Sequence, residues 1–243
     1  MKFAKNQFLI TLLLLTVIGC AKREVLITVE VHEQSDVDML IYSVPVLGTT
    51  YWGFADTIKQ SETGKFELKL KITQPSFVNI RDESSQNRVK LLVEPGKNYH
   101  VSMKPEKNVQ ITGTNEKGQM LYATFPDTEF VELELRKIVN LHDDTTTLML
   151  VLQKFNELKQ SEMSKFQELL DSREISKSFF DLVQKDRDCY YASMEARFLL
   201  IKTYPFVGEG AKIQEELLEL LEKVYNQYSP NDEELITSSF WSE

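Results

Sequence analysis

The spacing of the apolar residues changes near Pro126, and this change constrains the fold more than any other feature of the 243-residue sequence. Before Pro126, apolar and polar residues alternate, as in "FELKLKI" at residues 66–72, which is typical of a strand with one buried face. After it, apolar residues recur three or four positions apart, as in Leu148, Leu152 and Phe155, which is typical of helices. The sequence therefore predicts an α+β protein, with an N-terminal antiparallel β-sandwich followed by a C-terminal region of three to four helices.

Many short strands separated by turn residues are predicted in the first half, and this spacing favours a sandwich or a partial barrel. The turn positions include Gly64 and Gly96, where we expect a positive φ angle, and Pro95, which suits the first corner of a turn. The predicted strands are "VLITVEVH" at residues 25–32, "GKFELKLKI" at residues 64–72, and residues 37–44, 53–59, 77–81, 89–93, 99–103 and 109–112.

Three apolar stripes predict helices in the second half. They cover residues 148–170, residues 175–198 with an end near Pro205, and residues 213–228 with an end before Pro230. Residues 129–141 are a weaker candidate, because "VELEL" in this segment alternates as a strand would.

The first twenty residues have the layout of an export signal. Lys2 and Lys5 precede an uncharged apolar run at residues 8–18, and Gly19 and Cys20 follow it. The run fits a signal core of ~7–15 residues better than a membrane span of ~20. Such a segment can be cleaved nearby by ordinary signal processing, remain as an uncleaved anchor, or belong to a lipoprotein.

The sequence "VIGC" at residues 17–20 resembles the lipobox of bacterial lipoproteins. This resemblance implies that Cys20 receives a thioether-linked diacylglycerol, that residues 1–19 are removed, and that the new amine is acylated. Several acyl chains hold a protein to a membrane much more firmly than one. We therefore expect a membrane partner through lipidated Cys20 and a place in the cell envelope, at the outer membrane, with the periplasmic or surface orientation left open.

The net charge of the chain is concentrated in its second half. Residues 20–126, the predicted β-sandwich domain, hold 13 basic and 13 acidic side chains, whereas residues 127–243, the predicted helical region, hold 13 and 24. Because an acidic body has little attraction for phosphate backbones, we expect no nucleic-acid partner. For the same reason the acyl chains, and not a basic surface, should hold the protein to its membrane.

Cysteine usage argues against dithiol chemistry. Once Cys20 carries lipid, Cys189 is the remaining cysteine, so neither an intramolecular disulfide nor a Cys-x-x-Cys pair is possible. A reactive or intermolecular thiol is one interpretation of Cys189. A small buried side chain within a helix is the favoured one.

No pattern in the sequence predicts a metal site. His32, His100 and His142 are scattered, and alternation places His100 and Tyr99 on opposite faces of a strand. His142 is followed by two aspartates, but adjacent residues seldom converge on one metal ion, and Asp144 suits a helix N-cap. We therefore expect no bound metal.

Catalytic motifs are also absent from the sequence. Some carboxylates are close in sequence, but the two carboxylates of a hydrolytic enzyme are normally brought together by the fold, so this closeness does not indicate catalysis. The pairs are at residues 132 and 134, 215 and 216, and 233 and 234. Glu215, Glu219 and Glu222 fall on the polar face of a predicted helix. There is no Gly-x-Ser-x-Gly motif and no phosphate-binding Gly-x-x-x-x-Gly-Lys motif. We expect no cofactor and no enzymatic activity.

Tyr51 and Trp52 are the candidate ligand-binding residues of the sequence. They lie in "VLGTTYWGF", a predicted loop between strands. Loops on a rigid sheet often carry recognition, and exposed aromatic rings stack on sugars or peptides. The favoured alternative is that both rings fold onto the core.

Three segments of the first half resemble a known domain. They cover residues 55–80, 90–103 and 109–125, with Asp56-Thr57, Gly64-Lys65-Phe66, Pro75, Glu94-Pro95-Gly96 and Ile111-Thr112-Gly113 as the matching features. They resemble a β-rich domain of unknown function near the N-terminus of many envelope lipoproteins from anaerobic Gram-negative bacteria. There a helical region follows, and a thioredoxin-like domain of the TlpA/ResA thiol–disulfide oxidoreductase kind comes last.

The resemblance implies an architecture and an envelope location, but not the oxidoreductase activity. The chain ends at Trp241, Ser242 and Glu243, about where the thioredoxin fold would begin, and it holds no catalytic cysteine pair. We therefore expect a lipid-anchored, non-catalytic protein that binds or assembles with other envelope proteins. The alternative is an accessory N-terminal part of an oxidoreductase whose catalytic domain is missing or separately encoded.

Overall fold

The structure of the protein is a computed structural model. It describes residues 24–32, 37–44, 55–62, 64–82, 88–104, 108–125, 131–138, 148–203 and 215–228. The lipidation residue Cys20, the ligand-binding candidates Tyr51 and Trp52, His142 and the expected N-cap Asp144 lie outside these ranges.

Eight strands make up the first part of the described chain, and each predicted strand is present. They are β1 (Glu24–Val31), β2 (Met39–Ser43), β3 (Ala55–Glu62), β4 (Lys65–Lys71), β5 (Ser76–Arg81), β6 (Arg88–Val93), β7 (Asn98–Lys104) and β8 (Asn108–Gly113). Gly64 and Gly96 have φ angles of 72° and 75°, as expected for their turns.

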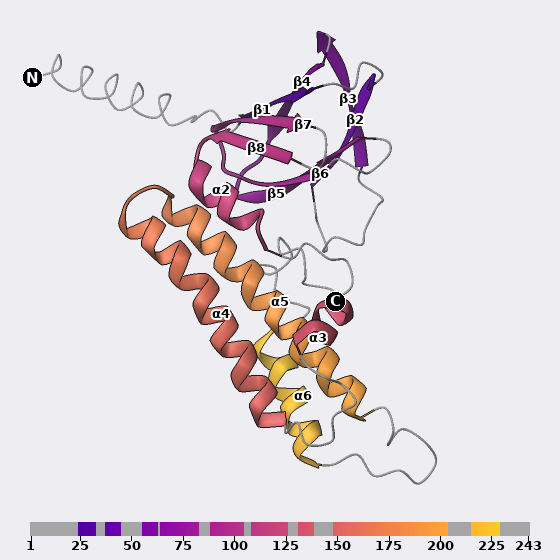
Figure 1. Cartoon of the computed structure of the whole chain (residues 1–243), viewed down its shortest axis with the longest axis vertical. Coiled ribbons are helices and arrows are strands. Elements are labelled where there is room, and N and C mark those ends of the chain that lie inside the picture. Colours follow the sequence, from indigo (N-terminus) through magenta and orange to yellow (C-terminus); the bar gives the residue numbers. More distant parts are fainter. Residues whose placement is uncertain are drawn as a thin grey trace, which may run out of the picture.

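The strands form one continuous sheet with the order β6-β5-β2-β3-β4-β1-β7-β8 (Figure 1). The predicted β-sandwich is not confirmed, because β3 pairs with both β2 and β4 and so joins all strands into one sheet. The prediction of a purely antiparallel sheet was wrong for one pair, since β1 and β7 run parallel. Alternation shows which face of a strand is buried, but the pattern reads the same in both directions along the chain, so it does not tell whether two strands pair parallel or antiparallel.

The sheet curves around a single core and is nearly barrel-like. Edge strands β6 and β8 contribute to the same apolar cluster as the central strands, which requires the two ends of the sheet to turn toward each other. One member of this cluster from each strand, in chain order, is Val25, Leu40, Ile58, Phe66, Val78, Leu91, Val101 and Ile111.

Side chains bond backbone groups along the outer edge of β6, which has no strand beside it in the sheet. The side-chain amide of Gln119 donates from Nε2 to the carbonyl oxygen of Leu92 at 2.6 Å and accepts from the Leu92 N–H at 3.2 Å. The hydroxyl of Tyr99 accepts the Glu94 N–H at 2.9 Å. These contacts replace part of the backbone pairing that full barrel closure would give, because buried peptide groups need partners.

Five helices follow the sheet in the described residues. They are α2 (Glu116–Tyr122), α3 (Val131–Ile138), α4 (Leu148–Asp171), α5 (Lys177–Thr203) and α6 (Glu215–Gln227). The stripes near residues 148, 175 and 213 therefore predicted α4, α5 and α6, and the weak segment at residues 129–141 is helical as α3. The short helix α2 was not predicted. None of the described helices is long and apolar enough to cross a membrane.

Helices α4 and α5 form a long antiparallel hairpin whose turn lies near α2, while α6 lies beside the other half of the hairpin (Figure 1). The sheet and the helices share a second apolar cluster, in which Phe77 and Leu92 from the outer face of the sheet meet Tyr122, Phe166 and Phe179. The two differently patterned halves of the chain are thus packed against each other.

Gly118 allows the close approach of α2 to the start of α5. A Cβ atom at this position would lie 2.5 Å from the Ile175 Cγ2 atom and 2.7 Å from the Phe179 Cε1 atom. Both distances are shorter than van der Waals contact. The glycine is therefore needed for packing, even though glycine is a poor helix former.

Candidate functional site

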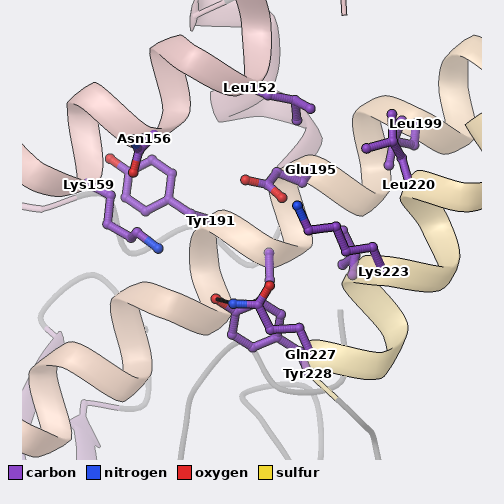
Figure 2. A pocket seen from close by; sticks show the side chains of 12 residues that line it. Leu152, Asn156, Lys159, Tyr191, Glu195, Leu199, Leu220, Lys223, Gln227 and Tyr228 are labelled. Atoms are coloured by element: carbon purple, nitrogen blue, oxygen red, sulfur yellow. Dashed lines mark hydrogen bonds between the residues drawn. The ribbon is translucent and has the colours of Figure 1, made fainter. Parts of the chain in front are cut away.

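A pocket of about 240 Å³ lies among α4, α5 and α6 (Figure 2). It is the candidate site because small-molecule sites are concave and combine apolar walls with a few polar groups. Its lining residues are Leu152, Asn156 and Lys159 from α4, Tyr191, Ala192, Glu195 and Leu199 from α5, Leu220, Lys223, Val224 and Gln227 from α6, and Tyr228 directly after α6.

Helical periodicity explains why these side chains share one pocket. On α4 the lining residues are spaced by four and three positions. On α6 Leu220 and Val224 are four positions apart, and Tyr228, directly after the helix, continues this spacing. Residues three or four apart lie on one face of a helix. Three of the apolar members, Leu152, Leu220 and Val224, belong to the predicted stripes, whereas Ala192 and Leu199 do not. The polar members were missed as a group because sequence patterning assigns single charged residues to solvent. Lys223 is indeed exposed at the pocket, whereas Glu195 and Lys159 are partly buried.

Glu195 is the carboxylate of the pocket, and it is only partly accessible. Burial raises the pKa of this carboxyl, and the positive charges of Lys159 and Lys223 oppose the rise. Figure 2 shows the Glu195 side chain directed between these two lysines. Among the described residues, Glu195 forms neither a hydrogen bond nor an ion pair.

The two lysines of the pocket differ in their partners. The Nζ atom of Lys159 lies 3.0 Å from Oδ1 of Asp188, so its charge is already paired. Lys223 makes no ion pair or hydrogen bond with any side chain in the described ranges. The pocket therefore holds one carboxylate and one ammonium group, Glu195 and Lys223, whose charges attract each other but which no direct hydrogen bond or ion pair joins in this part of the chain.

Two tyrosines belong to the polar part of the wall, together with the side-chain amides of Asn156 and Gln227. The Tyr191 hydroxyl donates to Oε1 of Glu162 at 2.9 Å, and burial together with the Glu162 charge raises its pKa. Burial and the charges of Asp188 and Glu195 raise the pKa of Tyr228 to about 12. Both phenols are therefore neutral at physiological pH and present a ring face and a hydroxyl group.

A buried ion pair supports the wall formed by α4 and α5. The guanidinium of Arg187 is almost fully buried and donates to both carboxylate oxygens of Glu162, at 2.8 and 3.2 Å. It also lies 3.9 Å from the ring centroid of Tyr190. Its neighbour Asp186 accepts a 2.5 Å hydrogen bond from the Tyr122 hydroxyl. This network fixes the two helices relative to each other and is not directed into the pocket.

The Glu94-Pro95-Gly96 segment does more than form a turn. Glu94 is buried, and its Oε2 atom accepts a 2.5 Å hydrogen bond from the Asn115 amide that precedes α2. Its Oε1 atom accepts from the hydroxyls of Ser176, at 2.7 Å, and Ser178 at the start of α5. The interpretation of this motif as a turn alone was therefore incomplete, since Glu94 also links the sheet to two helices.

The structure brings together two histidines that the sequence showed as scattered. The Glu30 carboxylate lies 4.0 Å from Nε2 of His32 and 3.7 Å from Nε2 of His100, because β1 and β7 are neighbours. These distances exceed hydrogen-bond range. Across the described ranges, no group of three or more His, Cys, Asp or Glu side chains could hold a metal ion.

The remaining sequence candidates are placed as follows. Cys189 is buried in the apolar cluster of α3, α4 and α5, as the favoured interpretation predicted. Glu215, Glu219 and Glu222 are exposed on α6, also as predicted. The lipidation residue Cys20 and the ligand-binding candidates Tyr51 and Trp52 remain predictions, because they lie outside the described residues.

No protein-family model and no curated protein matches the chain.

Proposed function

We propose that this protein is a lipid-anchored component of the bacterial cell envelope whose folded body has a non-catalytic binding role. The observation that carries the binding role is the pocket among α4, α5 and α6, in which Glu195 and Lys223 face the same space without a direct hydrogen bond or ion pair in the described chain. Unpaired charged groups beside apolar walls are typical of a site that fixes the orientation of a small ligand.

The anchor is supported by the signal layout and by chain geometry. Strand β1 begins at Glu24, so only residues 21–23 separate it from Cys20. Each residue of extended chain spans at most ~3.6 Å, so these residues allow a separation of about 15 Å between the Cα atoms of Cys20 and Glu24. A lipid on Cys20 would hold the sheet close to the bilayer surface, with the body as an envelope-facing domain that could meet other envelope proteins.

Replacement of Cys20 with serine tests the anchor. The variant should accumulate as an unprocessed precursor that fractionates poorly with membranes, because serine offers no thiol for the diacylglycerol. Cys189→Ser is the matched control, since Cys189 is buried in the helical core and should not affect processing. Normal maturation and membrane fractionation of Cys20→Ser would refute the proposal.

A role as the accessory part of a thiol–disulfide oxidoreductase is the second candidate. The order of elements, a β-rich part and then helices, is the one that the family resemblance implies. Insulin reduction by the purified protein separates the two functions. Turnover without added thioredoxin would contradict the non-catalytic role. The accessory role would be favoured if turnover required a separately encoded thioredoxin-like protein and exceeded the rate of that protein alone.

A further inference from the structure

We propose that the pocket among α4, α5 and α6 binds a small zwitterion with an aliphatic side chain, that is, a free α-amino acid or a molecule of the same chemistry. This inference rests on the binding role proposed above and names the ligand class of that site. Its basis is the pairing of charges, the volume and the apolar wall of the pocket.

The charges of the pocket call for a ligand with two opposite charges. Glu195 on α5 can accept hydrogen bonds from an ammonium group, and Lys223 on α6 can donate to a carboxylate. A simple anion would pair with Lys223 but would be repelled by Glu195, and a simple amine would meet the reverse problem. A zwitterion pairs with both groups at once.

Lys159 does not change this balance. Its ammonium group is held by Asp188 at 3.0 Å, so Asp188 offsets the charge that it brings to the pocket wall, although Lys159 still attracts Glu195. If Lys159 were available as well, the site would carry an excess positive charge and would favour an anion. Because it is paired, the available groups number one carboxylate and one ammonium.

The volume sets the size of the ligand. The pocket has a volume of about 240 Å³. Pockets for drug-sized ligands are larger, at ~300–1,000 Å³. The space therefore suits a molecule of amino-acid size.

Aliphatic side chains line the part of the pocket near Glu195 and Lys223. Leu152, Leu199 and Leu220 are drawn on the same side of the pocket in Figure 2, above the two charged groups in that view. An aliphatic ligand side chain placed here would be removed from water, at a gain of ~0.8 kcal/mol per CH₂ group. A strongly polar ligand side chain would gain nothing from this wall.

Calorimetric titration of the full chain with L-leucine tests the proposal, together with two analogues that each lack one charge. These analogues are 4-methylpentanoate, which has no ammonium group, and isopentylamine, which has no carboxylate. L-Leucine should bind saturably, and each analogue should bind about tenfold or more weakly, since one charged hydrogen bond is lost.

Variants connect the binding to the two pocket residues. Glu195→Gln should weaken L-leucine binding about tenfold or more without weakening 4-methylpentanoate, and Lys223→Met should weaken L-leucine binding without weakening isopentylamine. Glu222→Gln, an exposed change on α6 outside the pocket, is the matched control and should bind L-leucine as the wild type does. Two variants in different helices keep the test valid if one of them fails to fold.

Three results would overturn the inference. These are the absence of saturable L-leucine binding up to about 10 mM, equal affinity for L-leucine and either analogue, and unchanged affinity in Glu195→Gln and Lys223→Met. Equal affinity for an analogue would reject the zwitterion but keep a binding pocket. The anchor is tested separately by Cys20→Ser, so failure of this titration does not affect that result.

Discussion

Replacement of Gln119 with leucine should show how strongly side chains hold the open edge of the sheet. Gln119 is 1% exposed, and its amide bonds both the N–H and the carbonyl oxygen of Leu92, which is also buried. Leucine has a similar size but no polar group, so it would fill the same space and leave both peptide groups of Leu92 without a partner. The perturbation is therefore mainly the loss of hydrogen bonds and only slightly a change in packing.

The expected loss follows from the number of groups left unsatisfied. Each buried donor or acceptor without a partner costs ~1–3 kcal/mol, so the two groups of Leu92 should lower the free energy of unfolding by about 2–6 kcal/mol. Domains are stable by only ~5–15 kcal/mol. In urea the midpoint should fall by about 1–2 M with an unchanged slope, because the surface exposed on unfolding is nearly the same.

Gln110→Leu is the matched control, since Gln110 is exposed on β8 and the same chemical change there should alter stability by no more than ~0.5 kcal/mol. Urea unfolding followed by circular dichroism compares the two variants, and hydrogen exchange of the Leu92 amide should speed up in Gln119→Leu alone. If Gln119→Leu lost no more stability than Gln110→Leu, or if the Leu92 amide kept its protection, Gln119 would not be the partner that closes this edge.

Two further predictions concern the helices. Gly118→Ala should lower the free energy of unfolding, measured in urea, by about 1–3 kcal/mol, because the added Cβ would overlap Ile175 and Phe179. Alanine favours helices more than glycine does, so a variant more stable than the wild type would contradict this close packing. Burial raises the pKa of the Glu195 carboxyl above its ordinary 4.5, so the native state binds the carboxyl proton more tightly than the unfolded state does. The free energy of unfolding therefore falls as the pH rises through the native pKa and Glu195 loses this proton. The stability of Glu195→Gln relative to wild type, measured in urea at several pH values from 4 to 7, should therefore increase with pH, and a constant difference would show that the native pKa is not raised.

The strands and the long helices could be predicted because their signals are local. Ile27 and Val29 on β1 are fully buried, as alternation required, and the turn glycine Gly64 has the expected positive φ angle. The residues that fix each element lie within a few positions of one another, so periodicity reports them directly. The burial of Cys189 was predicted in a different way, from the general tendency of free cysteine to be buried, and its apolar cluster includes residues of α3 and α4.

Helix α2 and the second role of Glu94 could not be predicted, because their causes are distant in sequence. Helix α2 has only 7 residues and contains Gly118, so it has no periodic signal of its own and depends on packing against α5. Glu94 receives hydrogen bonds from Asn115 and from Ser176, which is 82 positions away. No local pattern indicates that such residues will meet.

Local sequence patterns are enough to locate the eight strands and the three long helices, the faces that they bury, and the half of the chain that carries the net charge. Tertiary structure alone decided that the strands join into one nearly closed sheet with a parallel β1–β7 pair, and that Glu195 and Lys223 meet in one pocket. The physical reason is that periodicity and charge are properties of neighbouring residues. Strand partners and pocket walls, by contrast, depend on which distant surfaces can be buried together.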